Sequence, residues 1–327
     1  MWNVSNAAAW CGVLSALSAI VLPSPTFASR QEPRTASLHL SLVHRGGGYK
    51  ERPDNTLDTF LWCWGNGAAV ECDCRRTKDG VGIMLHDHTL KRTARGITAE
   101  LAEKNVSEDL TWNDVKDVDV GSYIKEIDPS SVDYGHCRIP TIEATFAAMK
   151  GHPDWLCYVD EKGAPPKYIA AKAREAGVVG QVYFTGMHYH KALEWMREVP
   201  DGKTLMWIGT WPRPTHDAKG AERFEEYVER HMAKIRAGGY KGITSVQFHI
   251  WYKSGTEEPV IPREPYLRKA IAELHAHGIS VMAMPFEGGE KKETYFRMWD
   301  IGFDSFGTDF PSVMFSVMRK LRGNMTR

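Results

Sequence analysis

Residues 155–185 read WLCYVDEKGAPPKYIAAKAREAGVVGQVYFT, and this stretch decides the fold. The apolar run 155–160 is typical of a buried β-strand, 166–176 has a helical pattern, and 182–185 is a second short apolar strand. A strand, a helix and a strand in this order predict a βαβ unit with parallel strands.

The same alternation continues in both directions along the chain. We predict eight strands, at 38–43, 68–73, 155–160, 182–185, 204–208, 243–248, 279–284 and 305–308. The clearest helices are at 56–64, 141–149, 166–176, 190–199, 221–237 and 265–277, and Gly278 is a helix-stop signal for the last. Eight strands with intervening helices predict an α/β fold of the (β/α)8 TIM barrel type.

Two segments depart from this alternation. A short hairpin follows the second strand, turning at 78–80 and ending at 84–86. Residues 91–138 are polar, lack a clean strand and contain one predicted helix at 112–118. We interpret 91–138 as an insertion beside the functional site, within a single domain at 36–320.

The composition is that of a globular protein with a neutral surface. Hydrophobic residues make up 43% and charged residues 25% of the 327 residues. Lys+Arg and Asp+Glu are both 41, so we expect no bulk electrostatic binding to nucleic acid or anionic membranes. We expect a small-molecule partner instead.

The N-terminus has the pattern of a targeting segment. Residues 7–22 are apolar or small and uncharged, and small residues stand at Thr26 and Ala28, where a signal peptidase cleaves. We predict a signal peptide at 1–28 and a secreted or periplasmic mature chain, with an uncleaved anchor or a buried helix as the alternatives. No other stretch has the length and hydropathy of a membrane span.

Removal of the leader takes Cys11 away and leaves five cysteines, an odd number. Cys72 and Cys74 flank Asp73 on one strand, so they face the layer opposite to it. We therefore favour packing, or a disulfide from Cys63 or Cys137, over zinc ligation.

Polar side chains gather at the carboxyl ends of the predicted strands, the end that carries function in TIM barrels. In chain order they are His44 with Arg45, Glu71 with Asp73, Asp160 with Lys162, Gln247 with His249, Glu287, and Asp309.

Glu71 and Asp73 lie two residues apart on one strand and share a face. Adjacent inward carboxylates need a positive charge between them, and oxygen-only ligands favour Mg²⁺, Ca²⁺ or Mn²⁺. Asp160 on the next strand is the candidate third ligand. The alternative is a salt bridge to Arg45, Arg75 or Lys162.

His44 and His86 directly follow apolar strands and are candidates for a paired acid and base. Arg45 and Lys162 are placed to hold an anionic phosphate. The run Gly46–Gly48 either lets backbone N–H groups approach a ligand or serves as a flexible turn.

These residues form an ordered set of motifs: HRG at 44–46, RPDNT at 52–56, ECD at 71–73 and LHDHTL at 85–90. The set resembles the glycerophosphodiester phosphodiesterase family. Further similar motifs are LTW at 110–112, IPTIE at 139–143, VDEK at 159–162 and GTDFP at 307–311, so that the resemblance covers residues 40–312.

The resemblance implies a TIM barrel with an insertion after the second strand region, and one divalent cation, Ca²⁺ or Mg²⁺ with Mn²⁺ as a further candidate. It implies Glu71, Asp73 and Asp160 as metal ligands and His44 and His86 as acid and base, with Arg45 and Lys162 on the phosphate. The implied reaction cleaves glycerophosphodiesters to glycerol 3-phosphate and an alcohol. A related lysophospholipase D or sphingomyelinase D activity on lipids and a non-catalytic phosphate-binding barrel are the alternatives.

Three positions depart from the family pattern. Asp54 and Asp160 stand where the family usually has Glu, and residues 284–287 read MPFE instead of WTVN. The missing tryptophan leaves the identity of the alcohol open. Other side chains are candidates to rebuild that substrate wall, or else merely pack in loops: Trp211, His249, Trp251 and Met284.

Overall fold

The computed structural model describes residues 41–209 and 213–325, without the side chains of residues 49, 50 and 322–325. The signal peptide predicted at 1–28, residues 38–40 of the first predicted strand, and Trp211 lie outside the described residues.

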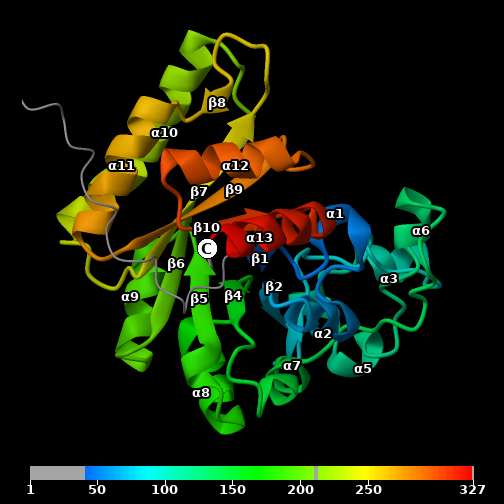
Figure 1. The fold of residues 1–327 in the computed structure, drawn as a ribbon. Coiled ribbons are helices and arrows are strands. Elements are labelled where there is room, and N and C mark those ends of the chain that lie inside the picture. Colours follow the sequence, from blue (N-terminus) through cyan, green and yellow to red (C-terminus); the bar gives the residue numbers. More distant parts are fainter. Residues whose placement is uncertain (1–40, 210–212, 326–327) are drawn as a thin grey trace, which may run out of the picture. The chain divides into compact units, whose positions relative to one another are not determined.

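Eight parallel strands close into a barrel in the described part of the chain (Figure 1). Each strand pairs with its neighbour, and β10 returns to pair with β1, which also pairs with β2. The strands in order are β1 Ser41–Val43, β2 Ala69–Arg76, β4 Cys157–Glu161, β5 Val182–Gly186, β6 Lys203–Ile208, β7 Ser245–Tyr252, β9 Ser280–Glu287 and β10 Ser305–Thr308. The predicted TIM barrel is confirmed.

Helices occupy the connections between strands, and the six predicted ones begin and end within three residues of their predicted bounds. The helices outside the insertion are α1 Gly48–Glu51, α2 Leu57–Gly65, α7 Ile142–Met149, α8 Pro166–Ala176, the 3₁₀ turn Val179–Gln181, α9 Tyr189–Glu198, α10 Ala218–Ala237, α11 Glu264–Ala276, α12 Lys292–Ile301 and α13 Pro311–Met325. Helices α2 and α7 follow the N-caps Thr56 and Thr141. The side chain of each N-cap accepts a hydrogen bond from a backbone N–H in the first turn. None of the helices in the described ranges is both long and apolar enough to cross a membrane.

The sequence analysis did not predict the last two helices. The buried residues of α12 are Thr294, Tyr295, Met298 and Ile301, a spacing of three and four that is typical of a helix. The signal for α12 was therefore present in the sequence.

Two short antiparallel strands extend the barrel. The predicted hairpin is present: β3 Gly82–Met84 pairs with the end of β2 after a turn in which Gly80 donates to Thr77. The strand β8 Val260–Ile261 pairs with the end of β7. Strands β7 and β9 both run beyond their predicted ends because they pair with each other as far as Trp251 and Glu287.

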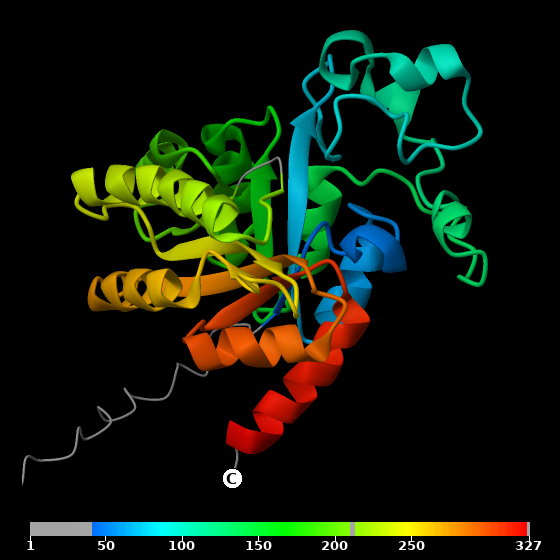
Figure 2. The same cartoon turned by 90° about the horizontal axis from the view of Figure 1, so that it is seen from above.

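The predicted insertion at 91–138 lies to one side of the barrel, coloured cyan to green in Figure 2. It contains four short helices, α3 Ala99–Glu103, α4 Val106–Asp109, α5 Trp112–Val115 and α6 Ile124–Ile127, of which α5 ends three residues earlier than predicted. A small apolar cluster of its own, which includes Leu90, Val106 and Val115, holds it together. Short helices of this kind depend on such tertiary packing.

The two faces of the barrel strands bury different sets of residues. Outward residues such as Val70, Val159 and Phe248 pack against the surrounding helices. Inward residues form a compact cluster inside the barrel: Leu42, Ala69, Leu156, Tyr158, Tyr183, Leu205 and Met282. Alternate residues on a strand face opposite sides, so this inner cluster fixes which residues face the mouth of the barrel.

The five cysteines of the described residues are all buried free thiols. Cys72 and Cys74 belong to the outer core, on the side opposite to Asp73, as the alternation predicts. The alternative of a disulfide from Cys63 or Cys137 is wrong: the Cys63 thiol donates to the Gly46 carbonyl at 2.6 Å, because the outer core holds it against that loop.

Candidate active site

The candidate site is the next layer of the barrel interior, directly above the inner apolar cluster. Two residues beyond Leu42 stands His44, and two residues beyond Tyr158 stands Asp160. The same step leads from Leu205 to Trp207 and from Met282 to Met284. Strand periodicity therefore brings residues that are distant in sequence to one mouth.

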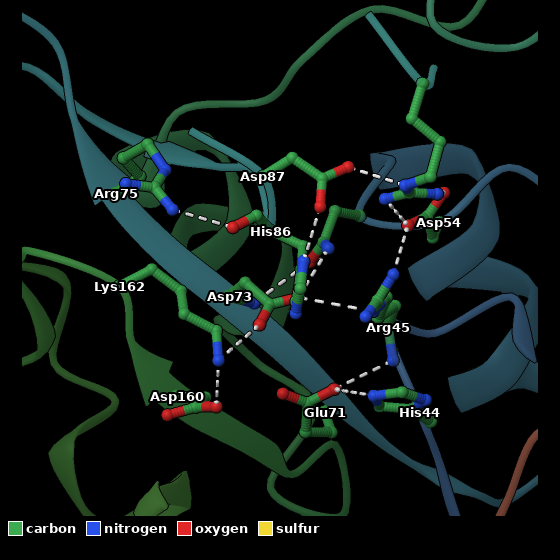
Figure 3. Close-up of polar contacts among 12 residues, drawn as sticks. His44, Arg45, Asp54, Glu71, Asp73, Arg75, His86, Asp87, Asp160 and Lys162 are labelled. Atoms are coloured by element: carbon green, nitrogen blue, oxygen red, sulfur yellow. Dashed lines mark hydrogen bonds and ion pairs between the residues drawn. The ribbon is translucent and has the colours of Figure 1, made fainter. Parts of the chain in front are cut away.

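This mouth is a cavity of about 220 Å³. One half of its lining, from β2, β4 and the segments after β1, β3 and β4, is charged or titratable: His44, Arg45, Glu71, Asp73, His86, Asp160 and Lys162. The side chains from β6, β7 and β9 are mostly apolar or aromatic: Leu205, Trp207, Gln247, His249, Met284 and Phe286. All seven residues predicted to bind metal or phosphate or to transfer protons lie in the charged half (Figure 3).

The three predicted metal ligands form one group. Glu71, Asp73 and Asp160 are buried, and a carboxylate oxygen from each lies within 4.8 Å of the other two. Burial raises the pKa of Glu71, which neighbouring Asp73 raises further, to about 8. Burial likewise raises the pKa of Asp160 to about 6, although Lys162 opposes the shift. Without a cation the group therefore tends to hold a proton.

The two predicted phosphate-binding cations contact these carboxylates. Lys162 Nζ lies 2.7 Å from Asp160 Oδ2 and 3.6 Å from Asp73 Oδ1. Arg45 Nε lies 3.8 Å from Asp73 Oδ2, and this buried N–H has no hydrogen-bond acceptor in the described part of the chain. The salt bridges considered as an alternative to a metal are thus present for Arg45 and Lys162, but Arg75 instead donates to the carbonyl of His86.

His44 is held by a carboxylate on each side. Its Nδ1 lies 2.7 Å from Asp309 Oδ1, and its Nε2 lies 4.0 Å from Glu71 Oε2. Because an ionised carboxylate only accepts, Nδ1 carries a proton and donates it to Asp309. Burial lowers the pKa of His44, but Asp309 and then Glu71 raise it to about 9.

His86 has a matching carboxylate partner. Its Nδ1 lies 2.7 Å from Asp87 Oδ1, and the other oxygen of Asp87 accepts from Arg92 Nε at 2.5 Å. Arg92 also donates to the buried Asp54, which accepts in addition from Tyr123. Arg92 and Tyr123 belong to the insertion, so the insertion takes part in holding this side of the site.

The HRG loop reaches its position through an unusual backbone. Arg45 and Gly46 have φ of 52° and 71°, and the Arg45 N–H donates to Glu71 Oε2 at 2.8 Å. A Cβ on Gly46 would lie 2.5 Å from Phe60, so only glycine fits there. Gly46 and Gly48 donate to the carbonyls of Val43 and His44, which shows that these glycines build the turn.

Asp73 is fixed by a side chain that the sequence analysis did not single out. Asn55 Nδ2 donates to Asp73 Oδ2 at 2.8 Å, and the Asp73 N–H donates back to Asn55 Oδ1 at 3.0 Å. Asn55 has φ of 56°, a conformation that Asn tolerates better than most residues. The signal for this role was the RPDNT motif.

Two of the described residues that were predicted for the substrate wall lie at the cavity. His249 and Met284 line the cavity, whereas Trp251 lies outside the lining and packs on Phe286, with ring centroids 6.0 Å apart. Two lining residues were missed, Trp207 and Phe286, although strand alternation from Leu205 and Met284 points to both. We refer to Trp207, His249 and Phe286 as the aromatic wall.

The rings of the aromatic wall are in mutual contact. Trp207 and His249 stack with ring centroids 5.3 Å apart, and Phe286 meets His249 edge-on at 4.4 Å. Burial lowers the pKa of His249 to about 3, with the charge on His44 acting in the same direction. The wall is therefore uncharged at neutral pH.

Glu287 lies at the carboxyl end of β9, as predicted, but its side chain faces away from the cavity. It follows Phe286 and so faces away from the mouth, where it pairs with Arg213 and with His216 Nε2 at 2.9 Å. It does not line the cavity.

Comparison with known proteins places this site in a family. Residues 44–182 match the model of the glycerophosphoryl diester phosphodiesterase family. A glycerophosphodiester phosphodiesterase of Caldanaerobacter subterraneus is 31% identical over 294 residues, which cover 86% of this chain and 98% of that protein. Glycerophosphodiester phosphodiesterase 1 of Bos taurus is 24% identical over 84% of this chain and 79% of its own.

Solved structures show the same fold. A glycerophosphoryl diester phosphodiesterase from Parabacteroides distasonis superposes with a TM-score of 0.61 at 20% identity, over 88% of each chain. A phosphodiesterase from Oleispira antarctica, solved with the product sn-glycerol-3-phosphate, gives 0.58 at 16% identity over 86% of this chain and 96% of its own. The match to the bacterial relative over nearly its whole length decides the assignment: the chain belongs to the glycerophosphodiester phosphodiesterase family.

Proposed function

We propose that the protein is a metal-dependent hydrolase of glycerophosphodiesters, which releases glycerol 3-phosphate and an alcohol. The observation that carries the proposal is the convergence of two carboxylate-held histidines, three carboxylates and two cations in one cavity. Family membership makes the chain a phosphodiesterase and argues against the non-catalytic barrel.

The names of the relatives support the choice of substrate. The curated relatives are glycerophosphodiester phosphodiesterases, and the Oleispira antarctica structure contains sn-glycerol-3-phosphate as its product. In the proposed reaction an oxygen nucleophile attacks phosphorus, the bond between phosphorus and the alcohol oxygen breaks, and that oxygen takes up a proton. The nucleophile is water, or the 2-hydroxyl of the glycerol through a cyclic phosphate that water then opens.

The donor set fits a hard divalent cation. Glu71, Asp73 and Asp160 offer oxygen atoms alone, which suit Ca²⁺, Mg²⁺ or Mn²⁺. Even with Lys162 and Arg45 beside the group, burial and neighbouring Asp73 raise the pKa of Glu71, so a further positive charge would stabilise the ionised carboxylates. When bound there, such an ion would neutralise phosphate charge and lower the pKa of an attacking hydroxyl.

Side chains of this protein bind the phosphate and transfer the protons in the proposed reaction. Arg45, whose buried Nε–H has no hydrogen-bond acceptor among the described residues, and Lys162 are the proposed anchors of the phosphate oxygens. His44 and His86 each bind a carboxylate through Nδ1, which leaves Nε2 for proton transfer. One histidine removes the proton of the nucleophile, and the other protonates the leaving oxygen.

A substrate and metal panel tests this function. Purified protein, stripped of metal with EDTA, should be inactive on glycerophosphocholine and related glycerophosphodiesters and should regain activity with Ca²⁺, Mg²⁺ or Mn²⁺. His44→Ala and His86→Ala should each lower kcat by about 10²–10⁴-fold with an unchanged circular dichroism spectrum. Full activity after exhaustive chelation would contradict the metal requirement, and near-normal kcat in either variant would contradict the histidine roles.

The aromatic wall favours a second candidate, hydrolysis of lysophospholipids. An apolar, uncharged half of the cavity beside the charged half suits a substrate with a hydrophobic portion. Choline release from lysophosphatidylcholine, measured against release from glycerophosphocholine, separates the two. A higher kcat/KM for the lysolipid would establish this second candidate over the first.

We also propose that the mature protein is exported. The support is the uncharged apolar run at 7–22 and the small residues that follow it. N-terminal sequencing of the protein recovered from its native compartment should place the first residue close to position 29. An intact N-terminus on cytoplasmic protein would contradict the proposal.

A further inference from the structure

A second group of metal-ligand side chains lies outside the catalytic cavity, where the insertion returns to the barrel. Asp58 stands in the first turn of α2, and His136 and Cys137 stand at the end of the insertion. One ligand atom from each of the three residues lies within 4.8 Å of the other two. None of them lines the cavity.

The measured distances are close to those of a tetrahedral zinc site. Zinc binds sulfur at about 2.3 Å and imidazole nitrogen or carboxylate oxygen at about 2.0–2.2 Å, so two ligand atoms at the tetrahedral angle lie about 3.4–3.6 Å apart. His136 Nε2 lies 3.7 Å from Asp58 Oδ1 and 3.8 Å from Cys137 Sγ. These two pairs need to approach by only about 0.3 Å.

The chemistry of this set differs from that of the catalytic carboxylates. A thiolate and an imidazole select a softer ion such as Zn²⁺, whereas the catalytic set contains oxygen alone. Cys137 is a free thiol that is buried beside Tyr123, Ile124 and Tyr134. It has no disulfide, so its sulfur is available to a metal.

The neighbouring positive charges leave one oxygen of Asp58 facing His136. Arg52 approaches the other oxygen of Asp58, with Nη1 3.7 Å from Oδ2, and its guanidinium lies 4.3 Å from the centre of the Trp62 ring. Arg138 donates to the backbone carbonyls of Gly135 and Cys137. Asp58 Oδ1 thus remains directed at His136, while its second oxygen pairs with a cation, as ligating carboxylates commonly do.

We propose that Asp58, His136 and Cys137 bind one Zn²⁺, with the fourth position open to water, and that the ion fastens the end of the insertion to α2. The segment just before α2 carries Asn55, whose amide holds Asp73, so the fastening acts on the frame of the active site. The proposal does not depend on the function proposed above.

Cobalt titration of the metal-free, reduced full-length protein tests the proposed zinc site. Co²⁺ replaces Zn²⁺ in tetrahedral thiolate sites and gives a sulfur-to-cobalt charge-transfer absorption in the near ultraviolet. The catalytic carboxylates contain no sulfur, so the absorption reports on a thiolate site and not on them. We expect the absorption to rise with added Co²⁺ to a plateau of one cobalt–thiolate site per protein molecule, and to disappear when excess Zn²⁺ is added.

Matched variants identify the ligands. Cys137→Ser should abolish the absorption, while Cys63→Ser, which alters another buried thiol, and Asp73→Asn should leave it intact. His136→Ala changes a side chain that is 65% exposed, so it should fold normally and weaken Co²⁺ binding by more than the ~10–100-fold typical of losing an outer-shell partner.

Three results would each overturn the proposal: no charge-transfer absorption in the unmodified protein, an absorption that survives Cys137→Ser, or an unchanged Co²⁺ affinity in His136→Ala. The Co²⁺ affinity of His136→Ala tests the proposal even if Cys137→Ser does not fold.

Discussion

Replacing Arg92 with Met should weaken both the fold and the active site, because this one side chain joins two carboxylates. Arg92 Nη2 lies 2.8 Å from Asp54 Oδ2, and Arg92 Nε lies 2.5 Å from Asp87 Oδ2. Burial raises the pKa of Asp54, but Arg92 and then Arg45 lower it below the ordinary value. The same guanidinium and His86 lower the pKa of Asp87 against its burial.

The size of the expected loss in stability follows from the burial of Asp54, whose side chain is 3% exposed. Removing one partner of a buried ion pair costs about 3–5 kcal/mol. Asp54 retains Tyr123 and Arg45, and the side chain of Arg92 is itself 31% exposed, so we expect a smaller loss of about 2–3 kcal/mol. For a domain of this size the loss corresponds to a fall in Tm of about 3–5 °C.

Calorimetry and kinetics together measure the effect. Arg95→Met is the matched control, since Arg95 lies on the same insertion and pairs with the exposed Glu126, a contact worth about 0–1 kcal/mol. Because Asp87 loses its anchor, His86 should also shift, and a misplacement of about 1 Å lowers kcat by about 10²-fold. A Tm for Arg92→Met no lower than that of Arg95→Met, with unchanged kcat, would refute the reasoning.

Four further predictions concern the chemistry. Of His44→Ala and His86→Ala, the variant that lacks the general acid should recover most of its activity on a 4-nitrophenyl phosphodiester, because that leaving group needs no proton. The other variant should be impaired on every substrate. Equal impairment of both variants would contradict separate roles. Metal affinity should rise with pH and level off above about 8, because the pKa is raised to about 6 for Asp160 and to about 8 for Glu71, and their protons must leave before the metal binds. Calorimetry in buffers of different ionisation enthalpy counts the released protons. Metal binding without proton release would contradict this prediction. Without metal, the raised pKa of Glu71 contributes stability that is fully present below about pH 4.5 and is lost as the pH rises through 8. The free energy of unfolding in urea should therefore fall across this pH range, and added metal should restore it. Phe286→Ala should raise KM for lysophosphatidylcholine more than for glycerophosphocholine if the aromatic wall contacts an apolar substrate portion, and equal changes would count against that contact.

The positions of the catalytic candidates could be predicted because two rules of local geometry suffice for them. Function in a TIM barrel lies at the carboxyl ends of the strands, and alternate strand residues share a face. Apolar strand patterns located those ends, so that Glu71, Asp73 and Asp160 were expected together before any distance was known. The same alternation turns Glu287 outward, because the strand continues beyond its predicted end at 284 and Glu287 follows the inward Phe286.

The partners of the site residues could not be predicted in this way. Asp309 and His44 are 265 residues apart, and their contact depends on β10 closing the barrel against β1. Arg92 and Tyr123 reach Asp54 only because the insertion folds back on the barrel. No periodicity in the sequence records such contacts.

The sequence by itself determined the (β/α)8 architecture, the charged half of the cavity and the family resemblance, because each depends on short-range patterns of apolar and ionisable residues along single strands. Only the tertiary structure decided which carboxylate orients each histidine, where the aromatic wall stands, and that Asp58 meets His136 and Cys137. These features arise from barrel closure and from the docking of the insertion, which bring side chains together across long stretches of chain.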